Sequence, residues 1–253
     1  MTPLWTSEVV AKVTGGQNSA PWTANGLSID TRSLEKGDLF LALQDVRDGH
    51  DFVASAFKKG ACAAIISKDI PDLAGPVLQV PDVMQALIDL AKAGRARSSA
   101  ICLAITGSVG KTSLKEMLAQ VFRGAGSTHA SQKSFNNHLG VPLTLARMPA
   151  DTERAVFEIG MSRPGEIAPL SQMIAPKGAV ITKIAPAHLE GLGSIEAVAD
   201  EKGRIFSGLG PQGLAILPGD DALYDRLRAA ALGTVPATHI FTFGRSQSAA
   251  ARV

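Results

Sequence analysis

The clearest chemical signature in the sequence is a glycine loop near the middle of the chain, Thr106-Gly-Ser-Val-Gly-Lys-Thr-Ser113. A short apolar run precedes the loop, and apolar residues at helical spacing follow it. A strand, a glycine loop and a helix in this order are the context of a phosphate-binding loop. Glycine lets the backbone approach an anion, and the first N–H groups of a helix attract phosphate oxygens. The predicted phosphate-binding residues are Gly107, Ser108, Val109, Gly110, Lys111, Thr112 and Ser113.

Two side chains of this loop have distinct predicted roles. Lys111 would bring a positive charge to the outer phosphates, and the hydroxyl of Thr112 would bind Mg²⁺. The general pattern has a further glycine where this chain has Ile105, so the match is to the shorter Gly-x-x-Gly-Lys-Thr form. The alternative is a glycine turn with a surface lysine. We favour the phosphate site because strand, loop, lysine, hydroxyl and helix all agree.

Two metal-binding candidates come after other predicted strands. Glu158 ends the apolar run 154–158, and His188 follows the run 180–182. Ligands of open parallel sheets bind at the carboxyl ends of the strands, so both residues could join Thr112 around a metal ion. Mg²⁺ prefers oxygen ligands, and a histidine in the set would also suit Mn²⁺. The alternatives are an acid that ends a strand in solvent and a structural histidine.

Lys202 is placed unusually for a lysine, because it falls on the apolar stripe of a helix predicted over 195–206. Its ammonium group either extends along the surface to water or is buried in the site. Burial lowers the pKa of a lysine, and a neutral amine can react with carbon dioxide to form a carbamate, an anionic metal ligand. The pattern by itself favours the surface position.

Polar side chains in other turns could contact a substrate. Asn136 and Asn137 precede a predicted helix, where their amides could bind a substrate or hold the turn. Arg32 could bind a diphosphate through its planar guanidinium, although a turn with local salt bridges is the favoured interpretation. Asp51 is expected to be the N-cap of a helix.

The pattern of elements that must position these residues is α/β. From residue 100 onward strands and helices alternate, which predicts a mostly parallel sheet covered on both faces. Residues 1–98 predict a smaller α/β domain, and residues 99–253 a second one whose last strand lacks a closing helix, as in a truncated domain. The predicted strands are 38–43, 63–67, 76–80, 101–106, 155–159, 178–182, 214–217 and 239–243. The predicted helices are 7–14, 51–59, 82–96, 112–122, 165–173, 195–206 and 222–231.

Composition narrows the possible functions. The chain has 253 residues, 45% of them hydrophobic, and a net charge of +2 that gives no indication of nucleic-acid binding. No apolar run approaches the ~20 residues of a membrane span, and the N-terminus does not resemble a signal peptide. Cys62 and Cys102 lie in apolar runs, which predicts reduced, buried cysteines in a cytoplasmic protein.

Taken together, these motifs resemble the Mur ligase family of peptidoglycan synthesis, and within it the ligases that add D-Ala-D-Ala. The segments that carry the resemblance are 106–116, Asn136-Asn137 with Gly140-Val-Pro142, Glu158-Ile-Gly with Pro164-Gly-Glu-Ile167, and 185–194. The resemblance implies an ATP-dependent enzyme that joins UDP-N-acetylmuramoyl-tripeptide to D-Ala-D-Ala through an acyl phosphate. We expect the protein to be a monomer. The resemblance also implies a third, Rossmann-like C-terminal domain, and we expect that domain to be absent from this chain.

The resemblance assigns roles to the candidate residues. Residues 107–113 would hold the phosphates of ATP, and Thr112 and Glu158 would bind one Mg²⁺ ion. His188 and a carbamoylated Lys202 would serve a second ion and, with Lys111, form the catalytic set. Thr31, Arg32, Asp48 and His50 would receive the UDP end of the substrate. The alternatives are a sister ligase for another amino acid, a P-loop NTPase and a nucleotide-binding fragment without activity.

Overall fold

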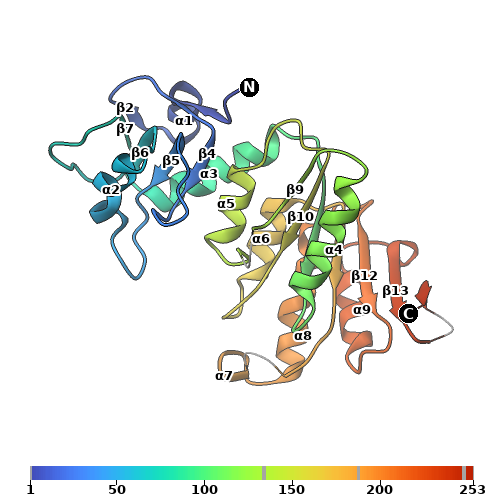
Figure 1. Cartoon of the computed structure of the whole chain (residues 1–253). Helices are drawn as coiled ribbons and strands as arrows, with labels where there is room; N and C mark the ends of the chain where they lie inside the picture. Colours follow the sequence, from blue (N-terminus) through green and yellow to red (C-terminus); the bar gives the residue numbers. More distant parts are fainter. Residues whose placement is uncertain (1, 133–134, 187–188, 247–248, 253) are drawn as a thin grey trace. The chain divides into compact units, whose positions relative to one another are not determined.

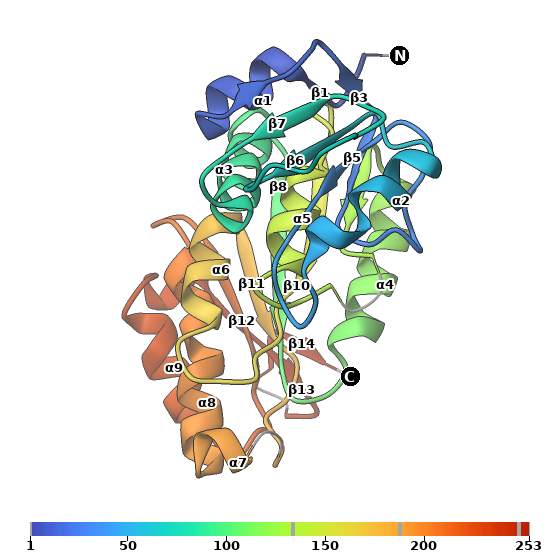
Figure 2. The ribbon, with the colours of Figure 1, turned by 90° about the vertical axis from the view of Figure 1, so that its left-hand side faces the viewer.

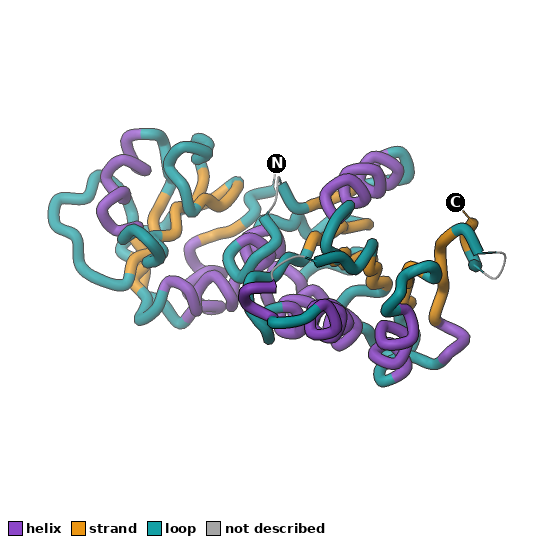
Figure 3. Tube along the Cα trace, turned by 90° about the horizontal axis from the view of Figure 1, so that it is seen from below, coloured by secondary structure: helices purple, strands orange, loops and turns teal. Residues whose placement is uncertain are grey.

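A computed structural model describes residues 2–132, 135–186, 189–246 and 249–252. The chain is mixed α/β and divides into two compact units, Met1–Arg97 with Leu145–Pro149 and Ser98–Thr144 with Ala150–Val253. Both units contain helices and strands (Figures 1 and 3), which alternate along most of the second unit. No helix in the described ranges has the length and apolar character needed to cross a lipid bilayer.

The second unit is built on a seven-stranded sheet whose strands all run parallel, in the order β14-β13-β12-β11-β8-β10-β9. Its strands are β8 Ile101–Thr106, β9 Thr128–Ala130, β10 Arg154–Glu158, β11 Gly178–Ile181, β12 Leu214–Pro218, β13 Ile240–Gly244 and β14 Ala251–Arg252. The parallel sheet predicted from the sequence is therefore confirmed. Its central strands β8, β10 and β11 are mostly apolar because both of their faces are covered.

The helices of the second unit lie on both faces of this sheet. Figure 2 shows α6, α8 and α9 along one face and α4 on the other. Ile105, Val156 and Val180 form a cluster on the α4 face, packed by Leu114 and Leu118 of that helix. The helical segments are α4 Lys111–Arg123, α5 Gly140–Ala146, α6 Ile167–Ile174, α7 Leu189–Leu192, α8 Ile195–Gly203, η2 Arg204–Gly208, α9 Tyr224–Leu232 and η3 Ala237–His239.

The first unit has a smaller sheet of five strands in the order β2-β7-β6-β5-β4, parallel except for β2. Phe40, Val53 and Ile66 belong to the core cluster between this sheet and helix α2. The strands are β1 Trp5–Thr6, β2 Gln17–Asn18, β3 Thr23–Ala24, β4 Gly26–Ser28, β5 Asp38–Leu41, β6 Ala63–Ile66 and β7 Val77–Gln79. The helical segments are α1 Ser7–Thr14, η1 Gly49–Phe52, α2 Val53–Lys58 and α3 Val83–Ala96.

The segment Leu145–Pro149 completes the first unit although it lies far along the sequence. Arg97 donates to the carbonyl oxygen of Leu4 at 2.6 Å and to that of Met148 at 2.7 Å. Trp5 donates its indole N–H to Ala146 O at 2.9 Å. The Arg97 guanidinium stacks 4.0 Å from the centre of the Trp5 ring, a cation–π contact. These contacts tie the end of α5 to both ends of the first unit.

Several sequence expectations are wrong in detail. The helix expected over 195–206 ends at Gly203 and continues as a 3-10 turn. Asp51 is not an N-cap: a 3-10 turn begins earlier, at Gly49, and Asp48 caps it by accepting from the His50 N–H. Both cysteines are free thiols, but only Cys102 is fully buried. Cys62 is half-buried, and burial raises the pKa of its thiol to about 11.

Candidate active site

The glycine loop lies where the order of the sheet changes direction. Strand β8 leads into the loop and then into α4, and its two neighbours, β10 and β11, lie on opposite sides of it. The chain thus continues first to one side of β8 and later to the other. In open α/β sheets such a switch point is where ligands bind, outside the carboxyl ends of the strands. The loop and the ends of β10 and β11 share this edge.

The loop backbone offers a row of hydrogen-bond donors. Among the described residues, no acceptor is found for the N–H groups of Val109, Gly110, Lys111, Thr112 and Ser113. The N–H of Ser108 is different, because it donates to Lys183 O at 2.8 Å. Free N–H groups at the start of a helix, aligned with its dipole, form a site for an anion.

Both glycines of the loop are required by its conformation. Gly107 and Gly110 have φ values of 150° and 83°, which residues other than glycine rarely adopt. A Cβ at Gly107 would also overlap the hydroxyl of Thr182. The loop can therefore bend tightly only with glycine at these positions.

Glu158 connects the loop to two other candidate residues. Its side chain is 1% exposed, so it is not an acid that merely ends a strand in solvent. The Thr112 hydroxyl donates to Glu158 Oε2 at 2.8 Å, and the Asn136 amide donates to Oε1 at 2.7 Å. Asn137 has a different role, because its side chain accepts from the N–H groups of Leu139 and Gly140 at the start of α5. Of the two asparagines, only Asn136 faces the site.

Lys111 folds back onto its own loop. Its ammonium donates to Gly107 O at 2.7 Å, so the charge sits beside the free N–H groups. Burial lowers the pKa of Lys111, and the negative charge of Glu158 acts in the opposite direction. An ammonium held by a backbone carbonyl can exchange this weak contact for a phosphate oxygen, which is a stronger, charge-assisted partner.

Lys202 is buried, which decides between the two interpretations of its position. The side chain is 1% exposed and does not extend along the surface to water. Burial, helped by the positive charge of Lys111, lowers its pKa to about 8. The neutral amine, which is the form that can react with carbon dioxide, is therefore far more populated near neutral pH than in an ordinary lysine. The neighbouring Glu201 is paired elsewhere: it accepts from the Ile167 N–H and contacts Arg204.

The donor set fits one magnesium ion next to a bound phosphate. Thr112 Oγ1 and Glu158 Oε2 are hard oxygen donors 2.8 Å apart. Adjacent ligands of an octahedral Mg²⁺ ion, each about 2.1 Å from the metal, lie about 3.0 Å apart. Within the described ranges no group of three His, Cys, Asp or Glu could hold a metal by itself, so phosphate and water would complete the shell. His188, the remaining predicted ligand, lies outside the described residues.

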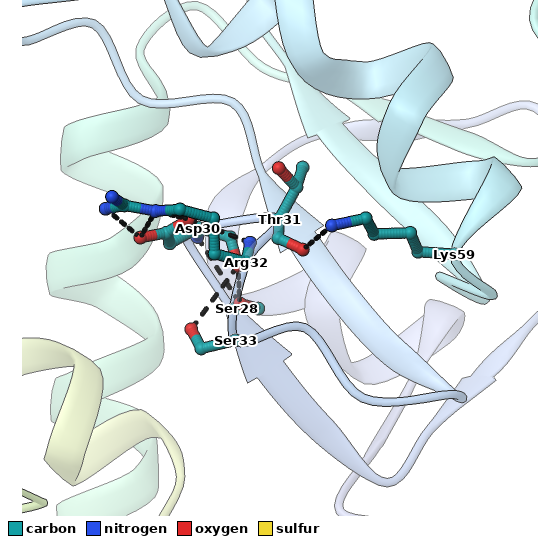
Figure 4. A network of polar contacts seen from close by, with 6 residues as sticks. All are labelled: Ser28, Asp30, Thr31, Arg32, Ser33 and Lys59. Carbon is teal, nitrogen blue, oxygen red and sulfur yellow. Dashed lines mark hydrogen bonds and ion pairs between the residues drawn. The ribbon is translucent and has the colours of Figure 1, made fainter.

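In the first unit, the turn at Asp30–Arg32 displays charged groups at the surface (Figure 4). Arg32 is paired with Asp30 through its Nη2 at 2.6 Å, yet its side chain is 88% exposed. This ion pair holds the pKa of Asp30 below its usual value. Lys59 donates to Thr31 O at 2.7 Å, and Figure 4 shows Lys59 and Arg32 extending to opposite sides of the turn. The local salt bridge expected from the sequence thus coexists with an accessible guanidinium.

Asp48 and His50 form a compact polar cluster. Asp48 accepts from the His50 ring Nδ1 at 2.6 Å, and the other ring nitrogen accepts from the Ser67 N–H at 2.9 Å. This second contact assigns the proton to Nδ1. Lys68 also contacts Asp48. Together with His50 it holds the pKa of the Asp48 carboxyl well below the usual range. His50 is buried and fully engaged within the protein, whereas Asp48 is partly accessible.

The sequence matches the description "Mur ligase middle domain" over residues 105–253 and "Mur ligase family, catalytic domain" over residues 23–95. The first match spans more than half of the chain. The chain belongs to the Mur ligase family. Its middle-domain match contains the glycine loop, Glu158 and Lys202.

Relatives within the Mur ligase family are similar over nearly the whole chain. The UDP-N-acetylmuramoyl-tripeptide--D-alanyl-D-alanine ligase of Rickettsia prowazekii is 38% identical over 251 residues, which cover 99% of this chain and 56% of that protein. A crystal structure of MurF from Acinetobacter baumannii has a TM-score of 0.83 at 32% identity, covering 97% of this chain and 54% of that one. MurF from Thermotoga maritima in complex with ADP has a TM-score of 0.73 at 28% identity, covering 87% and 50%. The chain thus spans about half the length of the relatives it matches.

Sequence reasoning missed one residue that contacts the loop closely. The Thr182 hydroxyl lies within 2.6 Å of Val109 O. Thr182 follows β11 directly, but a threonine at the end of a strand has no motif around it. The only available signal was its place after a strand beside β8, and that needs the strand order.

Proposed function

We propose that the chain carries the ATP-binding and UDP-substrate-binding parts of a ligase that joins UDP-N-acetylmuramoyl-tripeptide to D-Ala-D-Ala. The observation that carries the proposal is the placement of Lys111, Thr112 and Glu158 at one edge of the sheet, beside free loop N–H groups. Relatives of this name align with almost the full chain, which supports the choice of substrates. The second unit would bind ATP, and the first would bind the UDP end. A cytoplasmic monomer remains our expectation.

In this proposal the residues of the chain act mainly by positioning and charge compensation. The loop N–H groups and Lys111 bind the phosphates of ATP, so that the terminal carboxylate of the tripeptide can approach the γ-phosphorus despite its own charge. Thr112 and Glu158 would hold Mg²⁺, which when bound would supply further positive charge to the phosphate oxygens. Attack by the carboxylate gives an acyl phosphate and ADP. The amine of D-Ala-D-Ala then attacks the acyl carbon and releases phosphate.

In this proposal Lys202 and His188 would serve a second metal ion. A carbamate on Lys202 would be an anionic oxygen ligand, and the pKa of about 8 makes its formation accessible. In the first unit, Arg32 and the hydroxyl of Thr31 would receive the diphosphate of the UDP group, because both reach the surface of one turn. Asp48 and His50 would shape the neighbouring wall of that site, and Asn136 would orient Glu158.

Substrate dependence of ATP turnover tests the proposal. With the complete protein, ADP release should require the UDP-muramyl tripeptide, and sustained ADP release should also require D-Ala-D-Ala. With the tripeptide alone, hydroxylamine should trap the acyl phosphate as a hydroxamate. Turnover of ATP without a muramyl substrate would indicate a P-loop NTPase. Turnover with another amino acid would indicate a sister ligase, and nucleotide binding without any turnover would indicate a binding protein.

A further inference from the structure

The segment that follows β11 is joined to the glycine loop by a set of short hydrogen bonds. The Thr182 N–H donates to Thr106 O at 2.9 Å, and its hydroxyl lies 2.6 Å from Val109 O. The Ser108 hydroxyl donates to Ala185 O at 2.9 Å and accepts from the Ala185 N–H at 3.0 Å. The loop is therefore shaped by its neighbour in the sheet as well as by its own glycines.

The contact between Thr182 and Val109 fixes the direction of one peptide group. In a trans peptide the C=O and the following N–H point in opposite directions. The Val109 carbonyl is drawn toward Thr182, so the N–H of Gly110 points away from Thr182. That N–H is among those with no acceptor in the described part of the chain. The hydroxyl thus helps to present a donor to the anion site.

Thr182 also fits the space that Gly107 leaves open. A Cβ on Gly107 would overlap the Thr182 hydroxyl, so the threonine occupies the room that a side chain would otherwise take. The hydroxyl is also 3.2 Å from Thr106 O. Because one hydroxyl carries one proton, the shorter contact to Val109 O is the main hydrogen bond.

We propose that Thr182 is a positioning residue for nucleotide binding: its hydroxyl holds the Val109–Gly110 peptide in the orientation that turns the Gly110 N–H toward phosphate. This inference rests on the proposed function, because it assumes that the loop binds the phosphates of ADP and ATP. It adds a residue outside the loop to those that determine nucleotide affinity.

Binding of ADP in the presence of Mg²⁺, measured by calorimetry on the whole chain, tests the inference. Thr182→Val keeps the shape of the side chain and removes the donor, so we expect Kd for ADP to rise about tenfold, the loss of one oriented hydrogen bond. Thr182→Ser keeps the hydroxyl and should stay within about threefold of the wild type. In the ligase assay with the complete protein, Thr182→Val should raise KM for ATP by a larger factor than it lowers kcat.

A matched control is available at the opposite edge of the same sheet. The Thr128 hydroxyl donates to Gly126 O at 3.0 Å, so Thr128→Val removes a similar bond at the start of β9 and should leave ADP binding unchanged. Thermal unfolding of each variant verifies that it folds. If Thr182→Val is unfolded, Thr182→Ala takes its place in the comparison with Thr182→Ser.

The outcomes separate the inference from the proposed function. A wild-type chain that fails to bind ADP with Mg²⁺ overturns the proposed function and this inference with it. A wild-type chain that binds ADP, beside a folded Thr182→Val that binds it equally well, overturns the inference alone. Equal weakening in Thr182→Ser and Thr182→Val does the same, because packing rather than the hydroxyl would then be responsible.

Discussion

Substitution of Glu158 by Gln should separate metal binding from folding. The Glu158 carboxylate is buried and accepts from Thr112 at 2.8 Å and from Asn136 at 2.7 Å. The glutamine amide has nearly the same shape: its oxygen can still accept from Asn136, and the Thr112 hydroxyl can turn to accept from its NH₂ group. Two charge-assisted hydrogen bonds become neutral ones, which costs about 1–2 kcal/mol each. Removal of a buried charge offsets much of this cost.

We therefore expect Glu158→Gln to change the free energy of unfolding by less than about 1 kcal/mol. The effect on Mg²⁺ should be much larger. A carboxylate that ligates a divalent ion has its charge centred about 3 Å from it, so the two attract by about 11 kcal/mol at an effective dielectric constant of about 20, most of which is balanced by lost hydration. A net loss of about 1.4–2.8 kcal/mol corresponds to a ten- to hundredfold higher Mg²⁺ requirement for ADP binding.

Calorimetric titration of ADP at several Mg²⁺ concentrations measures this requirement, and urea unfolding measures stability. The control is Glu153→Gln, at the other end of the strand, where an exposed acid pairs with Arg154 at 2.8 Å. That variant should bind Mg²⁺–ADP like the wild type. An unchanged Mg²⁺ dependence in a folded Glu158→Gln variant would refute the assignment of Glu158 as a metal ligand.

Three further predictions concern other residues of the site. Lys111→Ala should abolish acyl-phosphate formation, measured as hydroxamate, without lowering the melting temperature, because among the described residues the ammonium donates only to carbonyls of its own loop. Normal ADP release by this variant would contradict the prediction. Burial lowers the pKa of Lys202 from 10.5 to about 8. Between pH 8 and pH 10.5 the unfolded chain therefore binds a proton that the folded chain has released. The free energy of unfolding should rise with pH over this range, by at most about 3 kcal/mol. Urea unfolding without metal or bicarbonate should show this rise in the wild type and not in Lys202→Met, and equal slopes would disprove it. Asn137→Ala should lower the free energy of unfolding by about 1 kcal/mol, because the cap of α5 is lost, and should leave ADP binding intact. Asn136→Ala should instead weaken the binding of Mg²⁺–ADP. Calorimetry that shows the reverse pattern would reject this division of roles.

The architecture of the second unit could be predicted because its signals are local. The strand before the glycine loop is confirmed as Ile101–Thr106, and the alternating pattern predicted the parallel sheet. The short strands β4, Gly26–Ser28, and β9, Thr128–Ala130, were missed. Each has three residues, which is too few for a period of two to stand out. β4 pairs with β5 and β9 with β10, the next strand along the chain in each case, and a pairing of this kind has no signal in the short strand itself.

The site residues could be predicted by type, but their roles depended on burial. Lys202 illustrates this limit, because its place on an apolar stripe suits both a surface lysine and a buried one, and only the fold shows that it is 1% exposed. Asn136 and Asn137 are adjacent residues of the same type, yet Asn136 contacts Glu158 and Asn137 caps a helix. A single residue step changes the direction of a side chain, and the sequence of a turn does not reveal that direction.

The contribution of Leu145–Pro149 to the first unit has a practical consequence. A gene fragment that stops after Arg97 would leave that guanidinium without the Met148 carbonyl and the Trp5 indole without Ala146 O. Such a fragment would lack part of its own core and should be a poor candidate for isolated expression. The same dependence restricts the exchange of domains between proteins. A recombination event between Arg97 and Ser98 would separate the first unit from Leu145–Pro149, although the two stretches of sequence pack together.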